Sequence, residues 1–137
     1  MLKNIYYSFM KERLKSPIFL IFFITSKCNS KCNHCFYWKN LNKNVKELTL
    51  EEIKKLSKEF NKIPEMALSG GEPFLREDIV EIYRVFNINN KPKFFTIPTN
   101  GLLPEKIYNK VKEMLECNFN TVLSINLSLD GTKDIHD

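Results

Sequence analysis

The sequence predicts an α/β fold built on a parallel sheet in the order βαβαβαβ. Apolar runs of strand length alternate with helical patterns, and no linker, repeat or low-complexity stretch interrupts them. Strands that alternate with helices of this length are typical of right-handed crossovers in one parallel sheet. With 137 residues, 43% of them hydrophobic and 27% charged, the chain is long enough to bury a core.

Four short segments rich in β-branched and aromatic residues are the predicted strands. They are residues 17–25, 65–69, 93–98 and 121–129. Such runs are typical of strands buried on both faces of a parallel sheet. The first contains the apolar run IFLIFFI, which is far shorter than the ~20 residues of a membrane-spanning helix. We therefore interpret it as a strand and expect a cytoplasmic protein without a signal peptide or membrane anchor.

Three helices are predicted between the strands. The first follows a capping box formed by Thr49 and Glu52, and its apolar residues recur at helical spacing. The second covers residues 78–87. The third begins after Pro104, a residue that suits the first turn of a helix. An amphipathic stretch precedes the first strand, so the chain divides into an N-terminal segment, 1–16, and a core, 17–137.

Unusual residues follow each predicted strand directly. The first strand runs into three cysteines, the second into Ser-Gly-Gly-Glu-Pro at 69–73, the third into Thr-Asn-Gly at 99–101, and the fourth into Ser-Leu-Asp-Gly at 128–131. Ligands of parallel α/β sheets bind beyond the carboxyl ends of the strands. The four segments therefore predict one functional site at that edge, where paired glycines let a ligand approach the backbone closely.

Cys28, Cys32 and Cys35 form a CxxxCxxC pattern with turn-forming residues between them. In a reducing compartment such closely spaced thiols indicate metal ligands rather than disulfides. Thiolate-rich sites select iron–sulfur clusters or zinc. A four-iron cluster normally has four cysteine ligands, so three would leave one iron open to another molecule. The alternatives are a structural zinc site completed by His34 or His136, and core cysteines on one helix face.

These motifs resemble those of the radical S-adenosylmethionine (SAM) superfamily over nearly the whole chain. The CNHC sequence followed by Phe36 and Tyr37, together with Ser-Leu-Asp-Gly, is similar to peptide-modifying members and to the SPASM group. The resemblance implies a partial (βα)6 TIM-like barrel, of which this sequence contains the first four strands. It also implies a 4Fe-4S cluster on Cys28, Cys32 and Cys35, with SAM bound at the open iron.

The activity implied by the resemblance is reductive cleavage of SAM to a 5′-deoxyadenosyl radical, which abstracts hydrogen from a peptide or small-molecule substrate. The SAM-binding residues it implies are His34, Gly70, Gly71, Glu72, Pro73, Thr99, Asn100, Ser128 and Asp130. It further implies a flavodoxin- or ferredoxin-type electron donor. The alternative function is a non-catalytic zinc or iron–sulfur domain for metal binding or electron transfer.

Three further expectations concern residues outside these motifs. Cys117 is predicted to be a buried free cysteine, and Phe22, Phe23 and Trp38 are predicted to pack in the core. The net charge of +5 comes from basic residues spread along the chain, mostly on predicted helix surfaces, so we expect neither nucleic acid nor a membrane as a partner.

Such a core usually contains six βα units, whereas this sequence stops just after the fourth strand. A fourth strand at an unclosed sheet edge is an aggregation liability that domains normally cover. We therefore expect a fragment, a truncated reading frame or half of an assembly that another chain completes.

Overall fold

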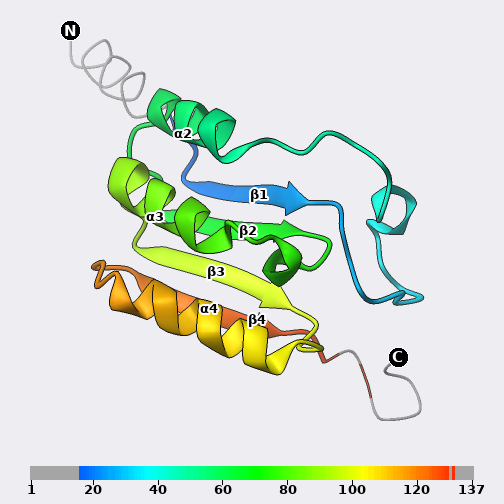
Figure 1. The fold of residues 1–137 in the computed structure, drawn as a ribbon. Helices are drawn as coiled ribbons and strands as arrows, with labels where there is room; N and C mark the ends of the chain where they lie inside the picture. The colour runs from blue at the N-terminus through cyan, green and yellow to red at the C-terminus, as the bar shows by residue number, and fades with distance from the viewer. Residues whose placement is uncertain (1–15, 130, 132–137) are drawn as a thin grey trace, which may run out of the picture.

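The computed structural model describes residues 16–129 and residue 131, and Figure 1 shows their fold. One parallel sheet contains four strands in the spatial order β1-β2-β3-β4, which is also their order in the chain. A helix follows each of the first three strands and precedes the next. The predicted α/β fold with a βαβαβαβ order is confirmed.

The strands are β1 (Phe19–Thr25), β2 (Glu65–Gly70), β3 (Phe94–Thr99) and β4 (Val122–Leu127). Their bounds differ from the predicted ones by at most two residues at either end. Because all four strands are parallel, their carboxyl ends and the loops that follow lie at the same edge of the sheet (Figure 1).

The helices are α2 (Leu50–Glu59), α3 (Ile79–Asn90) and α4 (Pro104–Glu116), with two short 3-10 helices, η1 (Trp38–Asn40) and η2 (Pro73–Leu75). The predicted capping box is present: the Glu52 amide donates to Thr49 Oγ1 at 3.2 Å, and the Thr49 amide donates to Glu52 Oε2 at 2.8 Å. The third predicted helix is also present, and Pro104 is itself its first residue.

Helix α3 runs three residues beyond its predicted end at residue 87. Its last residue, Asn90, is fully buried, and its side-chain Nδ2 lies 2.9 Å from the Ser57 carbonyl oxygen and 2.8 Å from that of Asn61. These contacts to α2 and the loop after it outweigh the weak helix propensity of the Asn-rich stretch. The helix then ends at Lys91, which has a left-handed backbone with φ 49°.

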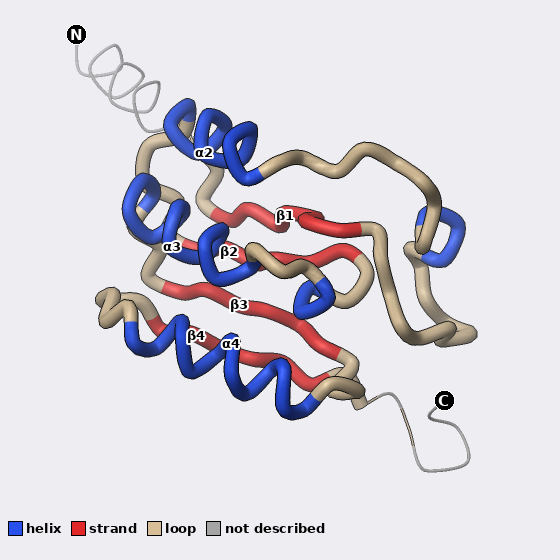
Figure 2. Tube along the Cα trace, in the orientation of Figure 1, coloured by secondary structure: helices blue, strands red, loops and turns tan. Residues whose placement is uncertain are grey.

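The three α-helices lie on one side of the sheet (Figure 2). The core between these helices and the sheet contains, among others, Ile24, Leu68, Phe86 and Phe95. The opposite side of the sheet has no second layer within the described residues. The prediction that the strands are buried on both faces was therefore wrong.

That uncovered side is called here the open sheet face. It carries the side chains that alternate with the core residues along each strand. Its exposed large apolar members are Phe19, Ile21, Phe23, Phe94 and Val122, whose exposed fractions lie between 39% and 54%.

Two of the three predicted core aromatics are on the surface. Phe22 packs against the core, with its ring 5.6 Å from that of Phe86. Phe23 belongs to the open sheet face and contacts Tyr37, and Trp38 is 63% exposed in η1. The prediction was wrong for Phe23 because adjacent strand residues point to opposite faces. It was wrong for Trp38 because η1 lies beyond the sheet, where no element of the described chain covers the ring.

Cys117 is a free cysteine, as predicted, but it is only half-buried. It caps the carboxyl end of α4, and its Sγ accepts a hydrogen bond from Arg84 Nε at 3.0 Å. A helix end of this kind faces solvent, so the prediction of burial was wrong.

No helix in the described part of the chain combines the length and apolar character that crossing a bilayer requires.

Candidate functional site

A cavity of about 240 Å³ lies at the carboxyl edge of the sheet, and loops that follow all four strands line it. Ten of the twelve predicted site residues are in its wall: Cys28, Cys32, His34, Cys35, Gly70, Gly71, Glu72, Thr99, Asn100 and Ser128. Pro73 is buried at the start of η2 and is not part of this wall. Asp130 lies outside the described residues, as does His136 of the zinc alternative.

The cysteine loop is closed by Asn42. The side chain of Asn42 accepts a hydrogen bond from the Cys28 amide through Oδ1 and donates to the Cys28 carbonyl oxygen through Nδ2, both at 3.0 Å. The Asn42 amide donates to the Ser26 carbonyl oxygen at 2.9 Å. Its backbone is left-handed, with φ 55°, a conformation that asparagine tolerates better than most residues. The first cysteine is therefore fixed by a residue fourteen positions away.

The paired glycines join the cysteine loop to β2. The Gly71 amide donates to the Thr25 carbonyl oxygen at 2.9 Å, and the Glu72 amide donates to that of Lys27 at 2.8 Å. A Cβ atom at Gly71 would lie 2.1 Å from the Lys27 carbonyl oxygen. Gly70 has φ 125°, and a Cβ there would lie 2.1 Å from the Thr25 carbonyl oxygen. The space that a side chain would occupy at these two glycines is therefore taken by the backbone carbonyl groups of Thr25 and Lys27.

Glu72 ties the end of β2 to the end of β3. Its carboxylate is 2% exposed and accepts hydrogen bonds from Thr99 Oγ1 at 3.0 Å, the Phe74 amide at 3.1 Å and the Asn100 amide at 2.8 Å. A buried carboxylate is costly unless donors satisfy its oxygens, and here each oxygen has at least one donor. The contacts make Glu72 a fixed link between two strand ends.

Asn100 connects the loop after β3 to the cysteine loop. Its Nδ2 donates to Asn29 Oδ1 at 2.8 Å, and its Oδ1 accepts from the Leu102 amide at 3.0 Å. Ser128, after β4, donates its amide to the Thr99 carbonyl oxygen at 2.9 Å. Hydrogen bonds of this kind connect the loops of all four strands across the edge of the sheet.

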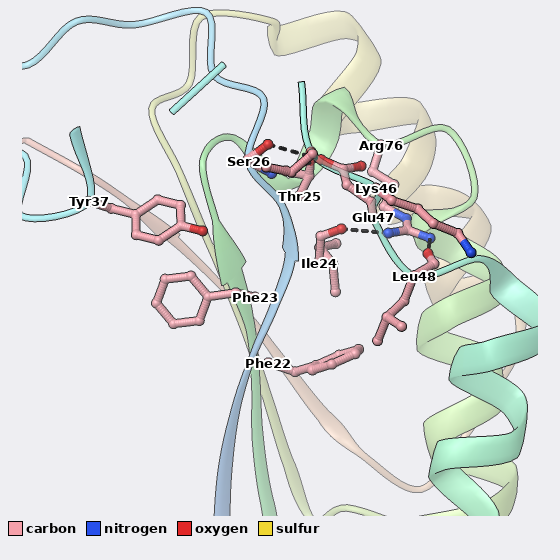
Figure 3. A pocket seen from close by; sticks show the side chains of 11 residues that line it. Phe22, Phe23, Ile24, Thr25, Ser26, Tyr37, Lys46, Glu47, Leu48 and Arg76 are labelled. Atoms are coloured by element: carbon pink, nitrogen blue, oxygen red, sulfur yellow. Dashed lines mark hydrogen bonds between the residues drawn. The ribbon is translucent and has the colours of Figure 1, made fainter. Parts of the chain in front are cut away.

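Glu47, in the segment that returns from the cysteine loop to α2, forms hydrogen bonds with the last residue of β1 and the residue after it (Figure 3). Its Oε1 accepts hydrogen bonds from Thr25 Oγ1 at 2.7 Å and from the Ser26 amide at 2.8 Å. Burial raises the pKa of Glu47, but the hydrogen bonds from Ser26 and Thr25 and the charges of Arg76 and Lys27 outweigh it and hold the pKa below its usual value. The carboxylate is therefore ionised at neutral pH.

Arg76 forms the second contact in this region. Its guanidinium donates to the carbonyl oxygens of Ile24 in β1 and Leu48 in the returning segment, as Figure 3 shows. An ion pair of 2.7 Å with Asp78 Oδ1 orients the guanidinium. Arg76 thereby joins the start of α3 to the last residues of β1.

All three cysteines of the loop are free and half-buried. Cys28 Sγ accepts from the Ser30 amide at 3.5 Å, and Cys32 Sγ lies 3.1 Å from Ser30 Oγ. In the part of the chain that the structure describes, no three His, Cys, Asp or Glu side chains are grouped closely enough to hold a metal ion. A cluster would therefore need the thiols to turn away from these loop partners. The donor set fits it, since three soft thiols line one cavity.

Burial raises the pKa of the Cys28 thiol. The Ser30 amide that donates to its sulfur acts in the opposite direction, and the Glu72 carboxylate and the two other thiols add to the effect of burial. A bound metal ion would reverse this balance, because a coordinated thiol is deprotonated.

Comparison with known proteins decides the family. The model of the radical SAM superfamily matches residues 22–137. The chain belongs to the radical SAM superfamily. Its cofactors are accordingly those of the superfamily, a 4Fe-4S cluster and SAM. The radical SAM alignment covers every residue that the structure brings to the cavity.

Curated relatives in the superfamily differ in their named activities. A GTP 3',8-cyclase of Clostridium perfringens is 37% identical over 91% of this chain. A cysteine-type anaerobic sulfatase-maturating enzyme of Clostridium novyi is 32% identical over 90% of it. A probable GTP 3',8-cyclase of Methanocaldococcus jannaschii is 37% identical over 66% of it. The chain spans only 38%, 35% and 30% of the lengths of these proteins, respectively.

Four residues that shape this radical SAM site were missed at the sequence level: Asn29, Asn42, Glu47 and Arg76. A turn signal was available for Asn42, which lies in the Asn-rich stretch Asn-Leu-Asn-Lys-Asn. Asn29 is one of the turn-forming residues between the cysteines, but that signal does not predict its contact with Asn100. For Glu47 and Arg76 the sequence contains no comparable signal, because their partners are distant in the chain.

Proposed function

We propose that this chain contains the radical-generating part of an enzyme that cleaves SAM reductively and abstracts hydrogen from a peptide or small-molecule substrate. The observation that carries the proposal is the convergence of three free thiols, the glycine-rich end of β2 and the loops after β3 and β4 on one cavity. When bound, the cluster supplies the electron that cleaves SAM to methionine and a 5′-deoxyadenosyl radical.

The proposed cluster ligands are Cys28, Cys32 and Cys35. The proposed SAM-contacting residues are seven members of the cavity wall, His34, Gly70, Gly71, Glu72, Thr99, Asn100 and Ser128, and in addition Pro73 and Asp130. In this arrangement the hydrogen bonds of Asn42 and Gly71 hold the ligand loop against the sheet. Those of Glu72 hold the ends of β2 and β3 together at the cavity.

The substrate class is kept open between a peptide and a small molecule. Similarity to the GTP 3',8-cyclases supports a small-molecule substrate, whereas similarity to the sulfatase-maturating enzymes supports a peptide substrate. We further propose residues 17–137 as the core, a cytoplasmic location, a flavodoxin- or ferredoxin-type electron donor, and neither nucleic acid nor a membrane as a partner.

Electron paramagnetic resonance tests the proposal. The chain is reconstituted anaerobically with iron and sulfide and reduced with dithionite, and its spectrum is recorded with and without SAM. A reduced-cluster signal that shifts on adding SAM is expected. Cys32→Ser should lose that signal, whereas the matched control Cys117→Ser, in the cysteine at the end of α4, should keep it. A chain that binds one zinc ion and builds no cluster would instead support the metal-binding alternative.

A further inference from the structure

The segment that carries the cysteines is strongly basic. Residues 27–46 contain five lysines and no aspartate or glutamate. All five, Lys27, Lys31, Lys39, Lys43 and Lys46, are exposed. They lie on the long connection from β1 to α2, which projects beyond the carboxyl ends of the strands (Figures 1 and 2). Lys39 belongs to the short helix η1, and the other four lie outside any helix. The positive charge therefore lies along the segment that contains the cysteine loop.

A second cavity, of about 420 Å³, lies against the same loop. Lys31, Cys32, Trp38 and Asn42 are among the residues that line it, and we call it the outer hollow. Cys32, with Ser30 and Leu41, also lines the candidate site cavity. Cys32 therefore lies in the wall that separates the outer hollow from the proposed cofactor site.

Exposed aromatic side chains accompany the lysines. Trp38 is 63% exposed and Phe36 is 85% exposed. The Lys39 ammonium group lies 5.6 Å from the centroid of the Trp38 ring. An exposed tryptophan beside cationic groups has the composition of a protein-binding hot spot, whose energy is realised when a partner covers the ring. Nothing in the packing of the described chain accounts for this exposure.

We propose that Lys31 and Trp38, which line the outer hollow, and Lys39 beside the Trp38 ring form the docking surface for an acidic protein that carries a flavin as one-electron donor. The inference rests on the proposed function, because it concerns how an electron reaches that site. The partner's carrier loses one electron and the site gains it from the Cys32 side. No bond forms or breaks in this step, and no proton moves.

Charge and position together favour an acidic protein over a nucleic acid. Lysines that surround a partner's contact area raise the rate of encounter with an acidic surface, and salt weakens the effect. The lysines would also attract a nucleic acid. A nucleic acid carries no electron donor, however, so its binding would not depend on the hollow lying next to the proposed cluster site. The position of Cys32 gives a protein donor a specific reason to bind here.

Binding of a purified acidic flavodoxin tests the docking surface. Its dissociation constant for the reconstituted full chain is measured by titration calorimetry at low and at physiological salt. The variant Lys31→Glu/Lys39→Glu is expected to bind roughly 10-fold more weakly, since it reverses two charges at the contact. The matched control is Lys55→Glu/Lys58→Glu on α2, which changes net charge equally at exposed positions away from the loop and should stay within about 2-fold of the parent. Trp38→Ala should also weaken binding.

Several outcomes would overturn the docking surface. Equal weakening by the two double variants would show that only net charge matters. Failure of the flavodoxin to bind the parent chain, or preferential binding of a single-stranded RNA oligomer through the same lysines, would also contradict it. The dithionite-reduced signal, with its SAM response, should be the same in parent and variants. Loss of that signal in the parent would count against the proposed function, while flavodoxin binding is measured independently of it.

Discussion

Single side chains at this site act mainly on backbone atoms. The Asn42 amide group pairs with both the N–H and the C=O of Cys28, as a neighbouring strand would. Asn29, Glu47 and Arg76 were missed from the sequence for a similar reason: their partners are distant residues, up to 71 positions away for Asn29. The thiols and glycines could be predicted, because their chemistry is carried by residue type and local spacing.

Replacing Asn42 with alanine should weaken cluster assembly without unfolding the protein. The variant loses two hydrogen bonds, each worth about 1 kcal/mol, and places alanine in a left-handed backbone. We expect a severalfold lower content of iron and sulfide per chain after reconstitution, with an unchanged circular dichroism spectrum. The matched control Asn44→Ala, at an exposed neighbouring position, should assemble like the parent. Equal cluster contents in both variants would rule out a role for Asn42 in holding the loop.

Replacing Gly71 with alanine should disturb the cysteine loop itself. The new Cβ would lie 2.1 Å from the Lys27 carbonyl oxygen and 3.1 Å from Cys28 Cβ, so the loop must move. We expect cluster content and SAM binding to fall together, measured by iron analysis and by equilibrium dialysis. Ala67→Ser, on the same strand but outside the cavity wall, also adds a single heavy atom and should retain both. A Gly71→Ala chain that keeps a full cluster but loses SAM would show instead that the glycine serves the ligand directly.

At the scale of helices and strands, most of the architecture could be predicted from local sequence signals. The capping box of α2 and the proline of α4 set helix starts that the structure confirms. The end of α3 could not be predicted, because it depends on the buried contacts of Asn90 with α2 and the loop that follows it. Strand β1 shows the same limit, since Glu47 and Arg76 hold its end from sequence positions that no periodicity marks.

The contact between Glu47 and the end of β1 predicts a pH dependence of stability. The pKa of Glu47 is lowered in the folded chain, so its contribution is present above the usual carboxyl value and is lost as the pH falls through the lowered one. Glu47→Gln should therefore lower the free energy of unfolding by about 1 kcal/mol at pH 7 and by less as the solution is acidified. Urea titrations from pH 7 to pH 3 measure the difference.

Glu59→Gln is the control for the acid titration. Glu59 is an exposed carboxylate at the end of α2, and its removal should leave the free energy of unfolding nearly unchanged at pH 7. A stability difference between Glu47→Gln and the parent that does not shrink toward acid pH would contradict the assignment.

For the molecule as a whole, the sheet has one covered and one uncovered side. Apolar run length alone could not distinguish a strand buried on both faces from one covered on a single face, because both sides carry large apolar residues. The position of the site was nevertheless predictable. Ten of twelve predicted residues line one cavity, because parallel strands bring all their carboxyl ends to one edge.

Two neighbouring residues of β4 separate the roles of the two sheet faces. Val122 is 54% exposed on the open sheet face, whereas Leu123 packs against the core beneath the helices. Val122→Thr should leave the unfolding free energy within about 0.5 kcal/mol and reduce self-association in sedimentation velocity. Leu123→Thr should instead lower that free energy by roughly 1–2 kcal/mol, since it removes buried apolar surface and buries a hydroxyl. Equal losses of stability would show that both faces are covered in solution.

The carboxylate of Glu72 has a consequence for how this edge opens. Three donors from two chain segments share it, and the adjacent amides of Gly71 and Glu72 are engaged by the residues that lead into the cysteine loop. Because these hydrogen bonds share one carboxylate or adjacent amides, breaking one of them weakens the others. The strand ends should therefore open as a single cooperative unit. Protection of the Gly71, Glu72 and Asn100 amides against deuterium would then rise and fall together, and a protease could reach the cysteines only when that unit opens.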